Sequence, residues 1–237
     1  MIKRKIKPKI VVVMPAYNAE KTLEKTYKDI PRGLIRELIL VDDHSIDKTV
    51  KIAQRLGLTF FVHSNNLGYG GNQKTCYWEA LKRKPDIVVM LHPDYQYDAT
   101  LMGKLVEPII DGSFDIMLGN RIRTRREALE GGMPLYKYLG NRFLTIVENT
   151  ILGLNLSEYH TGYRAYKRKV LETIPFQKFS NDFVFDQQML ITAAKCGFKI
   201  GEIPVPVRYF PEASLINLRR SLWYGLGTIY SLFRAGQ

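Results

Sequence analysis

Short apolar runs alternate with segments of helical length over the first half of the chain. The runs are rich in β-branched residues and predict buried strands at residues 10–14, 37–41, 59–63 and 86–91. Helices are expected between them, at residues 19–30, 47–56 and 73–82. Strands that alternate with helices indicate an α/β fold with a doubly wound, mostly parallel sheet flanked by helices.

The second half continues the alternation less regularly. It predicts helices at residues 100–111, 135–152 and 185–196 and a strand at residues 115–119. A further strand at residues 203–208 contains Pro204 and Pro206, so we place it at an edge of the sheet. From Leu215 onward apolar residues recur at helical spacing, which predicts an amphipathic C-terminal helix over residues 215–237. The rest of the chain, residues 1–214, has the length of one α/β domain.

Charge and composition narrow the possible partners and compartments. The formal net charge is +12, which attracts phosphorylated substrates, anionic lipid or nucleic acid. No nucleic-acid recognition motif accompanies the charge, so we expect no nucleic-acid partner. Cys76 and Cys196 are isolated thiols, as is usual in a reducing compartment. The apolar run at residues 10–14 is too short for a signal peptide, so we expect a protein on the cytoplasmic side.

A polar hook, residues 92–96, follows the fourth predicted strand. It presents His92, Asp94 and Gln96 where a parallel sheet has its ligand-binding edge. We interpret the hook as the site of a metal ion and a nucleoside diphosphate. The glycines at positions 68, 70 and 71 would allow the backbone to approach a ligand closely.

The motifs at the strand ends resemble those of a known family. In chain order they are Pro15-Ala16-Tyr17-Asn18, residues 41–49, Asn66-Leu67-Gly68-Tyr69-Gly70 and the polar hook. Together they resemble the nucleotide-sugar half of glycosyltransferase family 2. Later segments resemble its dolichyl-phosphate mannose synthase and polyprenyl-phosphate glycosyltransferase branch: Gly119-Asn120-Arg121, residues 158–164 and Phe185-Asp186.

The resemblance implies an inverting transfer of a sugar from a nucleoside-diphosphate sugar to a polyprenyl phosphate, dolichyl or undecaprenyl. It implies a GT-A type domain with a nucleotide-sugar half at about residues 9–98 and an acceptor half at about residues 99–214. The nucleoside pocket would contain Pro15, Tyr17, Val41, Asp43, His92 and Pro93. Asp42 and Asp47 would brace its loop, although aspartates at strand ends often only cap helices.

The hook departs from the family pattern, which reads Asp-x-Asp-x-Gln and holds Mg²⁺ or Mn²⁺. The matching residues are His92, Asp94 and Gln96, which the resemblance makes metal ligands. Imidazole in place of the first carboxylate should weaken Mg²⁺ binding or shift the preference towards Mn²⁺. Alternatively, His92 donates a hydrogen bond to phosphate and does not touch the metal.

Other departures concern single positions. Ala19 replaces a glutamate, Gln188 replaces a glutamate of the later helix, and residues 158–162 replace an Asp-x-x-Ser-Gly motif. The reduced number of carboxylates leaves open a catalytically impaired module that binds nucleotide sugars.

The acceptor determines which groups catalysis needs. A phosphate monoester is already largely dianionic at neutral pH, so its oxygen can attack without a protein base. By the resemblance, Arg121, Lys137, Asn141 and Arg208 would hold the acceptor phosphate, and Asp94, Glu158 and Arg121 would be catalytic. Glu158 could instead act as base towards a saccharide hydroxyl, which would place the enzyme in another branch. We expect Arg164 to be a structural ion-pair partner.

The arginines near the ends of the amphipathic C-terminal helix favour a membrane surface as a partner. We therefore expect a peripheral protein on the inner face of the membrane. Self-association into a homo-oligomer is compatible with the sequence.

Overall fold

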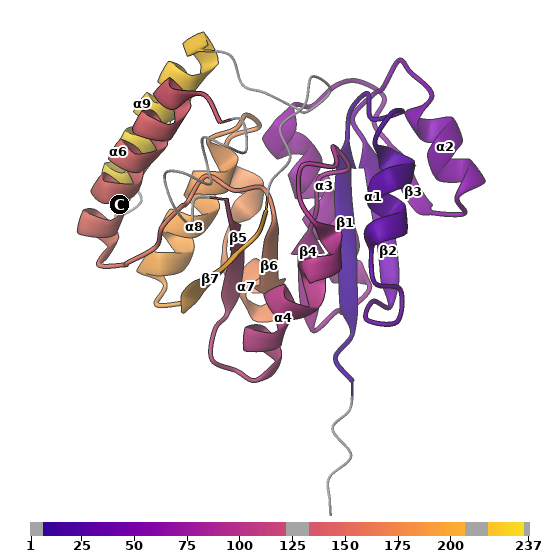
Figure 1. Cartoon of the computed structure of the whole chain (residues 1–237), viewed down its shortest axis with the longest axis horizontal. Helices are drawn as coiled ribbons and strands as arrows, with labels where there is room; N and C mark the ends of the chain where they lie inside the picture. The colour runs from indigo at the N-terminus through magenta and orange to yellow at the C-terminus, as the bar shows by residue number, and fades with distance from the viewer. Residues whose placement is uncertain (1–6, 122–132, 207–217, 235–237) are drawn as a thin grey trace, which may run out of the picture.

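The computed structural model describes residues 7–121, 133–206 and 218–234 (Figure 1). Its centre is a sheet of seven strands in the order β3-β2-β1-β4-β6-β5-β7. The strands are β1 (Ile10–Ala16), β2 (Glu37–Asp42), β3 (Thr59–Val62), β4 (Ile87–Met90), β5 (Ile116–Asn120), β6 (Arg164–Lys167) and β7 (Ile200–Pro204). Strand β6 runs antiparallel to both of its neighbours, and the other pairs are parallel. The predicted mostly parallel α/β sheet is therefore confirmed.

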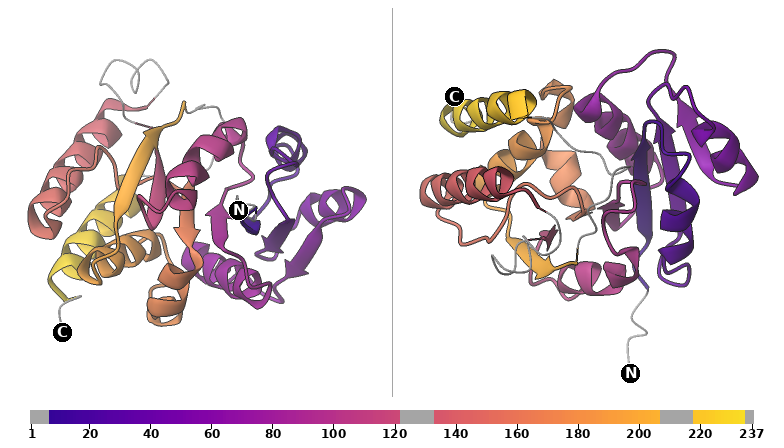
Figure 2. Two further views of the ribbon diagram at one scale, coloured as in Figure 1. Left: turned by 90° about the horizontal axis from the view of Figure 1, so that it is seen from below. Right: turned by 45° about the horizontal axis from the view of Figure 1, so that its top comes forward.

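Helices cover both faces of the sheet (Figure 2). The helices of the described residues are α1 (Leu23–Asp29), α2 (Thr49–Arg55), α3 (Tyr69–Lys82), α4 (Met102–Ile110), α6 (Leu135–Leu152), α7 (Arg168–Thr173), α8 (Phe185–Lys195) and α9 (Leu218–Arg234), with two short 3₁₀ helices, Ala99–Leu101 and Phe176–Lys178. Alternate residues of β1 face opposite cores: Val12 packs with α1, α2 and α4, whereas Val13 packs with α3, α7 and α8. Burial on both faces explains why the strands read as continuous apolar runs.

Helix α3 begins four residues earlier than predicted, and its glycines explain the difference. Gly68 precedes the helix with φ of 85°, a backbone conformation that favours glycine. A Cβ on Gly70 would lie 2.5 Å from the carbonyl oxygen of Ser180, and the Gly70 N–H donates to the carbonyl of Asn181. Gly70 therefore lets α3 pack against the segment before α8, and not against a ligand as the sequence suggested.

The acceptor half differs most from the sequence expectation. Strand β6 and helix α7 were not predicted. The four residues of β6, Arg164–Lys167, lack the apolar pattern that is typical of a strand. The strand predicted at residues 203–208 is β7, displaced towards the N-terminus. Among the described strands it pairs with β5 alone and ends the sheet order, so its edge position is confirmed.

Helices α6, α8 and α9 pack together beside the sheet (Figure 1). Within the described ranges, none of the helices combines the length and the apolar character needed to cross a bilayer. Glu148 of α6 is fully buried here, with one carboxylate oxygen 3.3 Å from His160 Nε2. Among the described residues neither of its oxygens has a hydrogen-bond partner. Burial raises the pKa of Glu148 well above its ordinary value, against the opposing charge of Arg164.

We predict that Glu148→Gln stabilises the protein at neutral pH. Because the folded state raises the pKa of Glu148, the unfolding free energy falls as pH rises above the ordinary value of 4.5. Glutamine does not ionise and escapes this loss. The gain should be about 1–3 kcal/mol at pH 8 and should shrink towards pH 5. Urea unfolding followed by circular dichroism over this pH range measures it.

Glu172→Gln is the matched control, since the side chain of Glu172 lies on the surface of α7 and is 56% exposed. Its effect should stay within about 0.5 kcal/mol. If Glu148→Gln instead destabilised the protein at neutral pH, Glu148 and His160 would form an ion pair and this prediction would be wrong.

Candidate active site

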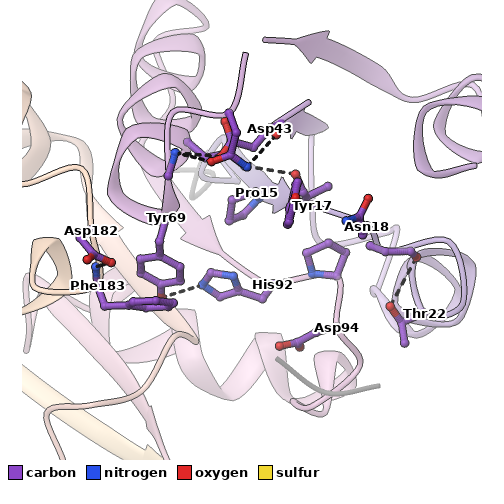
Figure 3. Close-up of a pocket in the computed structure, with 16 residues that line it drawn as sticks. Pro15, Tyr17, Asn18, Thr22, Asp43, Tyr69, His92, Asp94, Asp182 and Phe183 are labelled. Atoms are coloured by element: carbon purple, nitrogen blue, oxygen red, sulfur yellow. Dashed lines mark hydrogen bonds between the residues drawn. The ribbon is translucent and has the colours of Figure 1, made fainter. Parts of the chain in front are cut away.

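A cleft of about 530 Å³ opens at the carboxyl ends of β1, β2 and β4 (Figure 3). Its walls come from segments that are far apart in the sequence. Residues 15–19 and Thr22 end or follow β1, and Asp43 follows β2. Asn66, Gly68, Tyr69 and Asn72 precede or begin α3, and residues 92–94 follow β4. Asp182 and Phe183, just before α8, form the remaining wall. The parallel half of the sheet thus brings the predicted motifs together.

Most of the predicted nucleotide-binding residues line this cleft. They are Pro15, Tyr17, Asp43, His92 and Pro93, and Asp94 lies beside them. Val41 does not line it, because this residue is fully buried in β2, where its carbonyl accepts a hydrogen bond from Asn72. Gln96 is also buried and outside the lining, and its N–H donates to Asp94. We therefore leave Gln96 out of the set of cation ligands that faces the cleft.

Asp43 is held rigidly at the rim of the cleft. Its carboxylate accepts hydrogen bonds from the backbone N–H groups of Leu67 and Gly68, at 2.8 and 3.0 Å. The Nδ1 atom of His63 lies 2.8 Å from the same carboxylate. These contacts fix the loop before α3 against the end of β2, so the rim is preorganised for a ligand.

The loops after β1 and β2 also brace each other. Asp47 joins the two loops by accepting a hydrogen bond from the Glu20 N–H at 3.0 Å, and Asp42 braces the loop after β2 by accepting one from the Ser45 N–H at 2.9 Å. Asp47 also accepts from the N–H of Thr49, at the start of α2. The bracing role expected for Asp42 and Asp47 is confirmed.

The hook carries a histidine and a carboxylate side by side. Desolvation lowers the pKa of His92, and the charges of Asp94 and Asp186 partly oppose the shift. Desolvation raises the pKa of Asp94, and the charges of His92 and Arg121 oppose that shift. Without a ligand, burial thus disfavours the charged form of both groups. A bound cation would reverse this for Asp94, because a nearby positive charge stabilises the carboxylate.

The cleft contains functional candidates that the sequence reasoning did not single out. Tyr69 stacks on His92, with ring centroids 5.3 Å apart and planes 7° from parallel. Its hydroxyl donates to Asp186 Oδ2 at 2.7 Å and lies 3.2 Å from His92 Nε2. Phe183 also packs against the Tyr69 ring, with 4.5 Å between the ring centroids. The Phe185-Asp186 motif pointed to this segment, but nothing in the sequence linked it to the hook.

Arg121 and Glu158 form a buried pair on the acceptor side. Glu158 is fully buried and accepts hydrogen bonds from the Arg121 N–H at 2.8 Å, Arg121 Nε at 2.9 Å and Asn141 Nδ2 at 2.9 Å. Burial alone would raise the pKa of Glu158, but the charge and hydrogen bonds of Arg121 outweigh it and hold the pKa below its ordinary value. Glu158 is thus an ionised anchor for Arg121. Arg208 and the side chain of Lys137 lie outside what the structure describes.

Arg164 is structural, as expected. It is fully buried in β6, and its guanidinium donates to the backbone carbonyls of Thr161, Tyr159 and Asp186 at 2.6–3.0 Å. The Asp186 carboxylate lies 3.6 Å from it.

The donor set of the cleft fits a cation that is shared with a ligand. Within residues 7–121, 133–206 and 218–234, no group of three or more histidine, cysteine or acidic side chains could hold a metal ion alone. His92 and Asp94 supply one nitrogen and one carboxylate at the same wall. Cations bound through one or two protein groups normally take their remaining ligands from substrate phosphates and water. The site therefore fits a metal–diphosphate complex better than a metal alone.

Comparisons with known proteins agree with this geometry. A UDP-N-acetylglucosamine–dolichyl-phosphate N-acetylglucosaminyltransferase of Methanococcus voltae is 28% identical over 217 residues, which cover 84% of this chain and 86% of that protein. A dolichyl-phosphate hexose transferase of Haloferax volcanii is 29% identical over 202 residues, covering 84% of this chain and 82% of that protein.

A solved structure shares the fold. Glucosyl-3-phosphoglycerate synthase from Mycobacterium tuberculosis, in complex with Mn²⁺, UDP-glucose and phosphoglyceric acid, superposes with a TM-score of 0.71. The match is 23% identical and covers 97% of this chain and 80% of that one. The model of glycosyl transferase family 2 matches residues 11–175, which is more than half of the chain. With the predicted motifs gathered around one cleft at the ends of parallel strands, this chain belongs to glycosyltransferase family 2.

Proposed function

We propose that this glycosyltransferase moves a sugar from a nucleoside-diphosphate sugar to a polyprenyl phosphate, with inversion at the anomeric carbon. The observation that carries the proposal is the burial and hydrogen bonding of the Glu158 carboxylate. Glu158 is buried and engaged by Arg121 and Asn141. Glu158 is therefore not available to deprotonate a hydroxyl acceptor. Among the described residues, the carboxylates that line the cleft are Asp43, Asp94 and Asp182. A phosphate acceptor needs no protein base.

In this proposal the protein positions two anions and stabilises the leaving diphosphate. The nucleoside lies against Pro15, Tyr17 and Asp43, and the diphosphate lies along the hook. The Arg121 side chain is 14% exposed and is fixed by Glu158, and its charge opposes the rise in the pKa of Asp94. We propose that Arg121 attracts the acceptor phosphate, and we keep Lys137, Asn141 and Arg208 as its proposed partners. In-line positioning and charge neutralisation are the main contributions that such a transfer requires.

A divalent cation, Mg²⁺ or Mn²⁺, completes the proposed site. Asp94 and His92 would hold it, and it would supply charge neutralisation to the departing diphosphate. The solved neighbour with Mn²⁺ and UDP-glucose supports this assignment. A nitrogen donor is better tolerated by Mn²⁺ than by Mg²⁺, so we propose a preference for Mn²⁺.

The decisive test offers radiolabelled UDP- and GDP-sugars to dolichyl or undecaprenyl phosphate. We expect a lipid-extractable product that forms only with a divalent cation present. Asp94→Asn should lower the rate on the order of 100-fold, because a preorganised charge at the diphosphate is lost. Asp98→Asn is the matched control, since Asp98 lies outside the cleft and caps a 3₁₀ helix, a role that asparagine performs equally well.

Two outcomes would contradict the proposal. Transfer to a saccharide hydroxyl without transfer to lipid phosphate would place the enzyme in the hydroxyl-acceptor branch. Nucleotide binding that does not depend on metal, with no transfer from any donor, would identify an impaired binding module.

A lipid acceptor requires contact with a membrane, and the structure offers a surface for it. Each of α6 and α9 exposes an apolar stripe at helical spacing, and the two helices pack side by side (Figures 1 and 2). The residues are Leu139, Phe143 and Ile146 on α6 and Trp223, Leu226, Tyr230 and Phe233 on α9, each more than half exposed. Interfacial helices bind membranes through stripes of this kind, so we propose that this surface contacts the bilayer. The side chains of Arg219, Arg220 and Arg234 lie outside the described set.

Vesicle sedimentation tests the membrane surface. The double variant Phe143→Glu, Trp223→Glu should lose binding to vesicles that contain anionic lipid, because two charges enter the apolar stripes. Trp78→Glu is the matched control, because Trp78 is similarly exposed but lies on α3. If the double variant still sedimented like the wild type, the membrane would have to contact another face.

A further inference from the structure

We propose that Tyr69 and Asp186 are positioning residues that fix the tautomer of His92. In this arrangement His92 carries its proton on Nε2 and presents the bare Nδ1 nitrogen to the cleft as a cation ligand. The inference rests on the proposed metal–diphosphate site and names the atom through which the histidine acts. It also separates two roles left open by the sequence, metal ligand and hydrogen-bond donor to phosphate.

The imidazole is held on more than one side (Figure 3). Tyr69 stacks nearly parallel to it, and Phe183 packs against the Tyr69 ring. Gly162 lies against the ring edge, where an added Cβ would come within 2.7 Å of His92 Cδ2 and 3.0 Å of Nε2. These contacts orient the ring, with its Nε2 edge directed into protein.

The protons along the chain of hydrogen bonds can be assigned by counting. The Tyr69 hydroxyl has one proton and two polar neighbours, Asp186 Oδ2 at 2.7 Å and His92 Nε2 at 3.2 Å. A carboxylate can only accept, so the hydroxyl proton belongs to Asp186. The Tyr69 oxygen then has a lone pair directed towards His92, and Nε2 must be the donor.

The other polar neighbours of the Asp186 carboxylate are hydrogen-bond donors. The buried Arg164 guanidinium lies 3.6 Å from Oδ2, and Gln73 Nε2 donates to Oδ1 at 3.0 Å. Both neighbours supply positive charge or a donor, and neither can accept a proton from Asp186. In the alternative arrangement the Tyr69 hydroxyl would donate its proton to His92 Nε2. The Tyr69 and Asp186 oxygens would then lie 2.7 Å apart with no proton between them.

The second ring nitrogen therefore determines what His92 can bind. Among the described residues, none forms a hydrogen bond with Nδ1, and the imidazole lines the cleft next to Asp94. A neutral ring protonated on Nε2 has only a lone pair at Nδ1, which a phosphate oxygen cannot use. A divalent cation can use it. Metal-binding histidines usually donate their other N–H to a fixed acceptor, and here the Tyr69 hydroxyl, anchored by Asp186, fills that place.

Nitrogen-15 NMR of the ligand-free protein tests the tautomer directly. The chain has four histidines, and a His92→Ala spectrum identifies the signals of His92. We expect a protonated Nε2 and a bare Nδ1 in the wild type. Tyr69→Phe removes the acceptor and should give a mixture of both tautomers. Tyr27→Phe, which deletes a hydroxyl in α1, is the control and should leave the His92 signals unchanged.

Calorimetry with Mn²⁺ and UDP tests the ligand role. We expect Tyr69→Phe to weaken Mn²⁺-dependent UDP binding about 10-fold, as is typical when a partner of a metal ligand is lost. His92→Ala should weaken it further, and Tyr27→Phe should bind like the wild type. Binding of UDP without metal should be nearly unchanged in Tyr69→Phe, because only the orientation of the metal ligand is lost.

The possible failures are distinguishable. A wild-type His92 protonated on Nδ1, or Mn²⁺-dependent binding that is unaffected in His92→Ala, overturns this inference and leaves the proposed transferase intact. Absence of any Mn²⁺-dependent UDP binding by the wild type overturns both.

Discussion

The site depends on one buried charge, the guanidinium of Arg164. A charge without water must be paired and hydrogen-bonded, and Arg164 meets this requirement through three backbone carbonyls and the Asp186 carboxylate. Its partners come from the loop after α6 and from α8. Arg164 itself pairs with Met90 at the end of β4, two residues before His92. The same contacts that neutralise the charge therefore join the two halves of the fold at the cleft.

A second buried pair, Arg121 with Glu158, separates positioning from proton transfer. Because the folded protein keeps Glu158 ionised and fully buried, the carboxylate orients Arg121 and is not exposed to a substrate. Removing one member of such a pair leaves an uncompensated charge in the interior, which is costly. The arrangement suits a reaction whose acceptor arrives already charged. The hydrogen bonds of Glu158 thus bear on the choice between phosphate and hydroxyl acceptors more directly than its position in the sequence does.

Sequence reasoning was accurate where local pattern and topology agree. Central parallel strands are apolar on both faces, so β1, β2 and β4 could be predicted, and with them the convergence of Asp43 and Asp94. Strand β6 could not be predicted, because it contains the buried charge of Arg164 and does not show the alternation of apolar and polar residues that is typical of a strand. Likewise, Gly70 is needed because of its close contact with Ser180, more than a hundred residues away. The role of Tyr69 depends on its hydrogen bond to Asp186, which is similarly distant in the sequence. Such long-range pairs leave no periodic signal in one sequence.

The histidine in the hook also changes the charge balance of the proposed metal site. Two carboxylates would neutralise a divalent cation before any substrate arrived. One carboxylate and a neutral imidazole leave one positive charge on the complex, so the protein alone holds the cation less tightly. The diphosphate of the donor then supplies the missing negative charge, and cation and nucleotide sugar favour each other's binding. In the proposed site, this residual positive charge would stabilise the negative charge that grows on the departing diphosphate. With His92 in place of a carboxylate, the proposed site would bind the free metal ion more weakly and would hold it firmly only when the donor diphosphate is also bound.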